Sequence, residues 1–147
     1  MHPRACRGNS DFDTTHYITS DVTYALPFGH GRKFGATLPR FADELWTVYS
    51  DPEVARYVGG DLLNAESTRE QTERWASFWD NHGYGQSAVI SRETGQLLGR
   101  IGLSFWPDWN ETELGYVLSR TAQGCGLAAE GTRAWINWAT TNLPTTT

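Results

Sequence analysis

Residues 38–50 are the first segment of the chain in which hydrophobic residues recur at helical spacing. Across residues 38–50 they fall on one face of a helix, with Pro39 in a first-turn position, so we predict a helix there. A second, short helix is predicted over residues 51–57, and Gly59-Gly60 closes it.

A third helix is predicted over residues 67–80. Two candidate capping boxes mark its start: Ser67 with Glu70, and Thr68 with Gln71. Its apolar side is aromatic and consists of Trp75, Phe78 and Trp79. We expect these rings to pack in the core, with the wall of a substrate pocket as the alternative.

Alternation of apolar and polar positions predicts strands in the second half of the chain. Residues 86–91 and 96–105 form a hairpin around a turn at 92–95, and a further strand follows at 113–118. An earlier alternation at 21–28 also fits a strand, which its proline limits to the edge or end of a sheet. The order of the elements indicates an α+β fold, with helices on the faces of a sheet.

A loop with two glycines joins the 113–118 strand to a helix that begins at Leu127. Gly124 and Gly126 lie at the start of that helix, where the absence of a Cβ lets the backbone approach a ligand closely. The first turn of a helix carries N–H groups without intrahelical partners and the positive end of the helix dipole, so the loop suits a diphosphate. The plain alternative is a tight turn before a helix.

The segment from Gly124 to Ala129 also fits the dinucleotide fingerprint G-x-G-x-x-A. That fingerprint requires the glycines directly after the first strand of a βαβ unit, with an acidic residue ending the second strand about twenty positions on. A long, motif-bearing chain precedes these glycines, so the context does not fit a dinucleotide site.

Composition and charge narrow the classes of function. The 147 residues fit one domain, and no apolar run is long enough to cross a membrane. A formal charge of -5 argues against nucleic acid as the main partner, because phosphate backbones bind basic surfaces. The 4 histidines show no metal-ligand spacing, and the 2 cysteines without a secretory signal favour a reducing, cytoplasmic location.

Five motifs occur in an order that matches one enzyme family. They are Ser50-Asp51-Pro52-Glu53-Val54-Ala55-Arg56-Tyr57, His82-Gly83-Tyr84-Gly85, Thr94-Gly95-Gln96-Leu97-Leu98-Gly99-Arg100-Ile101-Gly102-Leu103, Glu113-Leu114-Gly115-Tyr116 and Gln123-Gly124-Cys125-Gly126-Leu127-Ala128. Together they resemble the GNAT superfamily of N-acetyltransferases, and its RimJ/RimL-like branch in particular, which acetylates protein N-termini and related amines. The resemblance covers roughly residues 38–143. It implies a mixed, mainly antiparallel sheet flanked by helices.

The resemblance also implies a co-substrate and where it binds. Acetyl-coenzyme A would lie with its pantetheine arm paired to the backbone of Tyr116, Val117 and Leu118. Its diphosphate would lie on the backbone amides of Gln123, Gly124, Cys125, Gly126, Leu127 and Ala128. An amine would then attack the thioester directly, without a covalent intermediate and without a metal.

Glu113 matches the position of the family's general base, which takes the proton of the amine directly or through water. The plain alternative is an exposed carboxylate at a strand end, and Glu111 is the reserve candidate for the base. Cys125 stands at a variable position of its motif, so we expect no role for its side chain.

Two departures from the family pattern set further expectations. Residues 1–37 form an N-terminal segment that is atypical of the family, and the 21–28 strand is the one element that we expect in it. Residues 38–147 form a partial acetyltransferase domain that lacks the two strands and the helix of the family's C-terminal part.

We therefore expect an incomplete form with weak or no activity, which associates as a homodimer or otherwise through an unpaired strand edge. The acceptor is left open between a protein N-terminus and a small amine, and the alternative function is a non-catalytic acyl-coenzyme A-binding module.

Overall fold

The computed structural model describes residues 22–25, 38–59 and 63–144. Their strands form one antiparallel sheet in the order β1 (Val22–Ala25), β2 (Gln86–Ser91), β3 (Leu97–Trp106) and β4 (Glu111–Leu118). β1 lies within the predicted 21–28 strand, whose other residues fall outside the described ranges. The remainder of the 1–37 segment falls outside them as well.

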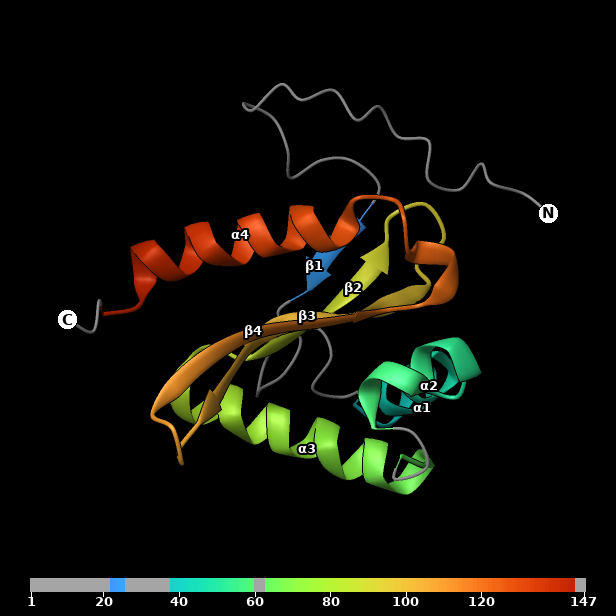
Figure 1. Cartoon of the computed structure of the whole chain (residues 1–147), viewed down its shortest axis with the longest axis horizontal. Coiled ribbons are helices and arrows are strands. Elements are labelled where there is room, and N and C mark those ends of the chain that lie inside the picture. Colours follow the sequence, from blue (N-terminus) through green and yellow to red (C-terminus); the bar gives the residue numbers. More distant parts are fainter. Residues whose placement is uncertain (1–21, 26–37, 60–62, 145–147) are drawn as a thin grey trace.

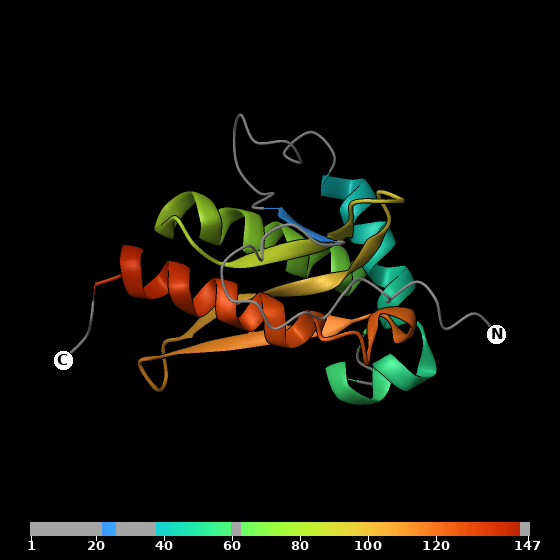
Figure 2. The same ribbon diagram turned by 90° about the horizontal axis from the view of Figure 1, so that it is seen from above.

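Helices cover both faces of the sheet. α1 (Leu38–Tyr49), α2 (Pro52–Val58) and α3 (Ala65–His82) lie on one face, and α4 (Leu127–Asn142) lies on the other (Figure 1). Seen from above, α2 lies beside the end of β4, at the side of the sheet opposite to β1 (Figure 2). The predicted α+β architecture is confirmed. None of the helices within the described ranges is long and apolar enough to cross a bilayer.

α3 begins earlier than its sequence pattern predicts. Asn64 caps it: the Asn64 side chain accepts from the Ser67 backbone N–H, and the Ser67 hydroxyl accepts from the Asn64 N–H, both at 2.9 Å. This reciprocal pair satisfies two donors that a helix start leaves open, so neither predicted capping box is used. At the other end, Gly83 adopts a left-handed φ of 72° and stops the helix after His82.

The core fills both sides of the sheet. Between the sheet and α1, Phe41 and Leu45 are buried, and on the opposite face Trp135 of α4 is 5% exposed. The Trp135 indole donates to the Ser87 hydroxyl at 3.1 Å, which in turn donates to the Ile101 carbonyl at 2.6 Å. Trp79 is buried as expected for core packing, and its indole donates to the Gln86 carbonyl at 2.5 Å.

Arg100 of β3 links the sheet to α1 and α3. Its guanidinium donates to the Tyr49 hydroxyl at 2.6 Å and to the Gln86 side-chain oxygen at 2.9 Å, and it lies 5.0 Å from the centre of the Trp75 ring. Burial raises the pKa of Tyr49, and the nearby Arg100 charge opposes that rise. Trp75, which is half-buried, therefore contributes a cation–π contact to the packing between α3 and the sheet.

β3 and β4 approach each other closely at Gly99. This residue has a φ of 151°, and a Cβ built there would collide with the Val117 carbonyl oxygen. Only glycine allows this approach, which fixes the end of β4 against β3.

Candidate functional site

A groove of about 540 Å³ lies at the C-terminal end of β4. Three segments that are separate in the sequence line it. They are Val54, Tyr57 and Val58 from α2; Tyr116, Val117 and Leu118 from β4; and Ala122, Gln123, Gly124, Gly126, Leu127 and Ala128 from the loop and the start of α4. The structure thus brings together eight of the nine residues predicted to bind the coenzyme, all except Cys125.

The outer edge of β4 forms one wall of the groove. The Ser119 N–H donates to the Leu98 carbonyl at 2.7 Å, and Leu118 lies opposite Gly99. Hydrogen-bonded and non-hydrogen-bonded pairs alternate along an antiparallel ladder. The backbone of Val117 therefore bonds to β3, whereas Tyr116 directs its N–H and C=O toward the groove. By the same alternation Leu118 also directs its backbone groups away from β3, and its carbonyl accepts from the Gln123 side chain. Of the three predicted pairing residues, Tyr116 and Leu118 therefore have backbone groups on the edge along which a ligand could lie.

Gln123 ties the loop to the end of β4. Its side-chain amide donates to the Leu118 carbonyl at 3.1 Å. Its backbone N–H donates to the carbonyls of Ser119 at 3.2 Å and Arg120 at 3.3 Å, within the 3-10 turn η2 (Arg120–Ala122). The Gln123 amide is therefore used within the protein, and backbone donors for an anion begin at Gly124.

The backbone of the loop favours glycine at both of its glycine positions. Gly124 has a φ of 76° and Gly126 a φ of 77°, in the left-handed region where other residues are strained. Gly126 is the N-cap of α4, and no side chain from the described part of the chain caps this helix. Its start therefore presents backbone donors and the positive end of the helix dipole to the groove.

Cys125 lies between the two glycines but does not line the groove. It is disulfide-bonded in the structure. This differs from the reduced cysteines that the sequence favoured.

Glu113 lies outside the groove, nearer the start of β4. It is exposed, faces Ser104 of β3, and accepts a hydrogen bond from the Trp106 indole at 2.8 Å. Because side chains alternate along a strand, Glu113 and Val117 lie on the face of α1 and α3, whereas Tyr116 lies on the face of α4. Glu111, the reserve candidate, is exposed at the first position of β4.

Sequence reasoning missed the wall that α2 provides. Val54, Tyr57 and Val58 lie three and four positions apart, so they share one face of the helix. Val54 is 2% exposed and anchors α2, whereas Tyr57 is 81% exposed. That spacing was visible in the sequence, but nothing in it indicated that this face would meet the end of β4.

An ion pair lies behind the groove, between α2 and η2. The Arg120 guanidinium donates to Asp51 Oδ1 at 2.7 Å, and the same oxygen accepts the Glu53 N–H at 2.9 Å. These two bonds, the Arg120 bond first, lower the pKa of the Asp51 carboxyl. Asp51 is therefore both the N-cap of α2 and the partner of Arg120.

The described residues show no cluster of three or more His, Cys, Asp or Glu side chains that could hold a metal ion.

Comparisons with known proteins agree with this geometry. The family model for the acetyltransferase (GNAT) domain matches residues 37–147. The uncharacterized protein YkkB of Bacillus subtilis is 34% identical over 98 residues, which cover 62% of this chain and 54% of that protein. The chain spans a little over half the length of the curated relatives it matches.

Solved structures show the same fold. An acetyltransferase from Agrobacterium tumefaciens is 28% identical with a TM-score of 0.62, and the match covers 94% of this chain and 75% of that chain. The ribosomal-protein acetyltransferase RimL, in complex with coenzyme A, is 13% identical with a TM-score of 0.56, and the match covers 83% of this chain and 65% of that chain. From the family model and the shared fold, the chain belongs to the GNAT family of acetyltransferases, as its motifs predict.

Proposed function

We propose that this chain binds acetyl-coenzyme A in the groove and transfers the acetyl group to a primary amine, either a protein N-terminus or a small amine. The observation that carries the proposal is the groove itself. It lies between the edge of a strand and a loop at the start of a helix, and the glycines of that loop have left-handed φ angles. The chain also belongs to a family of acetyltransferases.

The two parts of the groove suit two parts of the coenzyme. The outward backbone groups of Tyr116 match the amides of the pantetheine arm, which would add to β4 as a further strand does. The amides from Gly124 to Ala128, at the positive end of the α4 dipole, match the diphosphate. The apolar side chains of Val54 and Val58 flank the arm.

Glu113 is the proposed general base. Its carboxylate is exposed, so an amine can reach it, and the Trp106 indole fixes one of its oxygens at 2.8 Å. In the reaction the amine nitrogen forms a bond to the acetyl carbon, the thioester C–S bond breaks, the amine proton passes to Glu113 directly or through water, and coenzyme A leaves as the thiolate.

One observation favours a second candidate, a non-catalytic acyl-coenzyme A-binding module. Glu113 does not line the groove. A module would need the groove alone, whereas an enzyme also needs a base within reach of the thioester.

Calorimetric titration with acetyl-coenzyme A tests the groove. Gly126→Glu places a carboxylate at the proposed diphosphate position and should abolish binding. Gly83→Glu is the matched control, because Gly83 has a similar φ of 72°, equal open space around a Cβ, and lies outside the groove. Absence of binding by the wild type, or equal loss in both variants, would contradict the proposed site.

A thiol-release assay separates the two candidates. Release of coenzyme A that depends on an added peptide N-terminus or small amine identifies the enzyme. Binding without amine-dependent release, across a panel of both acceptor types, identifies the module.

A further inference from the structure

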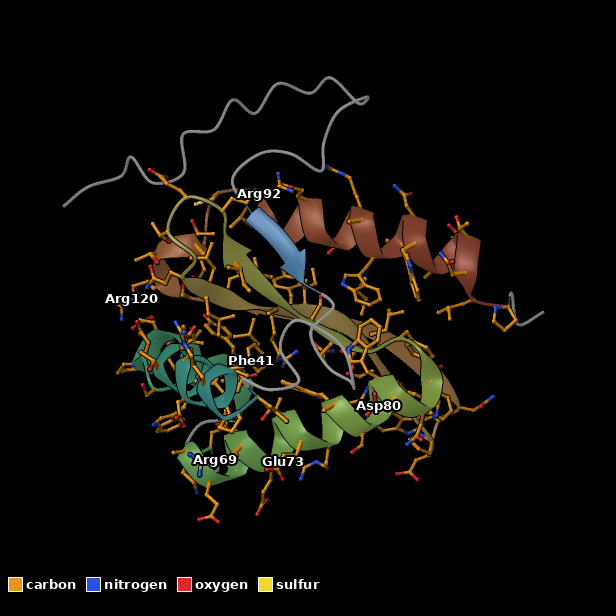
Figure 3. The ribbon with its side chains drawn as sticks, turned by 180° about the vertical axis from the view of Figure 1, so that it is seen from behind. Phe41, Arg69, Glu73, Asp80, Arg92 and Arg120 are labelled. Carbon is orange, nitrogen blue, oxygen red and sulfur yellow. The ribbon has the colours of Figure 1, made fainter. Side chains whose placement is uncertain are left out.

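The Asp51–Arg120 pair differs from the other ion pairs of the described residues. Three of those pairs join neighbours on one helix, and one joins α1 to α3. Asp51 and Arg120 instead join segments 69 positions apart, and the Asp51 side chain, 29% exposed, is the least exposed of the paired side chains. Figure 3 shows Arg120 on the loop beyond the sheet, beside the N-terminal helices.

Asp51 and Arg120 each lie at the start of a segment that forms one wall of the groove. Asp51 caps α2, and its carbonyl accepts the N–H groups of Val54 at 2.9 Å and Ala55 at 2.8 Å. α2 supplies the wall of Val54, Tyr57 and Val58. Arg120 begins η2, whose last residue, Ala122, lines the opposite wall just before the glycines.

The pair itself does not touch the groove. Asp51 and Arg120 line a separate hollow of about 380 Å³ on the side of α1 and the β2–β3 turn. Neither side chain lines the groove, so the pair can affect a ligand there through the backbone of α2 and η2 or through the field of its charges.

We infer that Asp51 and Arg120 are positioning residues that hold α2 against the coenzyme loop and so set the width of the groove for acetyl-coenzyme A. A single oxygen, Asp51 Oδ1, accepts hydrogen bonds from both the α2 backbone and the Arg120 guanidinium. This one atom therefore links the segments that form the two walls of the groove. This inference rests on the proposed coenzyme site.

Two variants remove the pair without removing the cap. Asp51→Asn keeps a good N-cap residue but loses the charge, and Arg120→Gln removes the guanidinium. Each should weaken acetyl-coenzyme A binding by about threefold, the scale of a partly exposed ion pair. The double variant should be no weaker than either single one, because the two residues act as a unit. Additive losses, or unchanged affinity in both single variants, would overturn the inference.

Amide hydrogen exchange without coenzyme tests the same inference independently of the proposed function. In both single variants, the rates of amide hydrogen exchange should rise in residues 52–58 and also in residues 120–128. Arg56→Gln is the matched control, since it removes the exposed Glu53–Arg56 pair within α2 and should leave 120–128 unchanged. If the wild type fails to bind acetyl-coenzyme A, the proposed function fails, and the exchange result still decides the role of the pair. Exchange that rises only around the substituted residue would overturn it.

Discussion

Glu113 is the residue on which catalysis is proposed to depend. Glu113→Gln keeps the shape of the side chain and removes its basicity, so it should lower turnover at neutral pH by a factor of roughly 100 or more. The measurement is the pH profile of kcat with a saturating peptide acceptor. Glu93→Gln, at an exposed position in the β2–β3 turn, is the control and should match the wild type. An unchanged profile in Glu113→Gln would exclude Glu113 as the base.

Asp51 makes folding stability depend on pH. Its pKa is lowered from the ordinary value of 3.8, chiefly by the hydrogen bond from Arg120. A carboxyl with a lowered pKa in the folded state stabilises the fold above its unfolded pKa, and this stabilisation is lost as the pH falls through the folded pKa. The free energy of unfolding of the wild type, relative to Asp51→Asn, should therefore be constant near neutral pH and decline below pH 3.8. Urea unfolding across this range measures it. A difference that stays constant down to the lowest pH would contradict the pairing.

The β3–β4 pair is the element that places the groove. Gly99→Ala puts a Cβ against the Val117 carbonyl, so the end of β4 must move away from β3. We expect a loss of about 1–3 kcal/mol in the free energy of unfolding, the range for forced overpacking. Because Tyr116 and Leu118 move with Val117, affinity for acetyl-coenzyme A should fall as well.

Gly95→Ala is the control for this substitution. Gly95 has a left-handed φ of 70° but open space around a Cβ, so only backbone strain of about 1–2 kcal/mol is expected. Affinity for the coenzyme should then be retained. Equal loss of affinity in the two alanine variants would show that the contact between Gly99 and Val117 does not position the groove.

The elements themselves could largely be predicted from the sequence, because period and turn residues are local signals. The hairpin, the strand before the loop and the helix after it all follow from such signals. The start of α3 could not be predicted, since Asn64 and Ser67 compete with two equally suitable pairs downstream. The loop that we propose for the coenzyme could be identified from its motif. The α2 wall was missed because it depends on a contact between segments far apart in the chain.

At the scale of the whole molecule, β4 ends the sheet of the described residues. Its outer edge carries backbone groups that can pair with another strand, and Trp106, Trp109 and Tyr116 expose aromatic surface nearby. We therefore expect the 147-residue chain to self-associate as its concentration rises. Sedimentation velocity over a range of concentrations measures this.

Thr112→Lys tests whether the strand edge carries that association. Thr112 is exposed on β4, and a lysine on an edge strand disfavours strand pairing. Thr140→Lys makes the same change of charge on the exposed side of α4 and should leave association unchanged. Equal association in the wild type and the Thr112 variant would show that another surface is responsible.

The left-handed glycines and the bonds of Gln123 have a consequence for the kinetics of binding. Both features belong to the protein backbone and its own side chains, so the fold sets the shape of the loop before a ligand arrives. A site that is already shaped loses little conformational entropy on binding. Association should then be a single bimolecular step, with an observed rate that rises linearly with the concentration of acetyl-coenzyme A. A rate that levels off at high concentration would mean that the loop has to rearrange first.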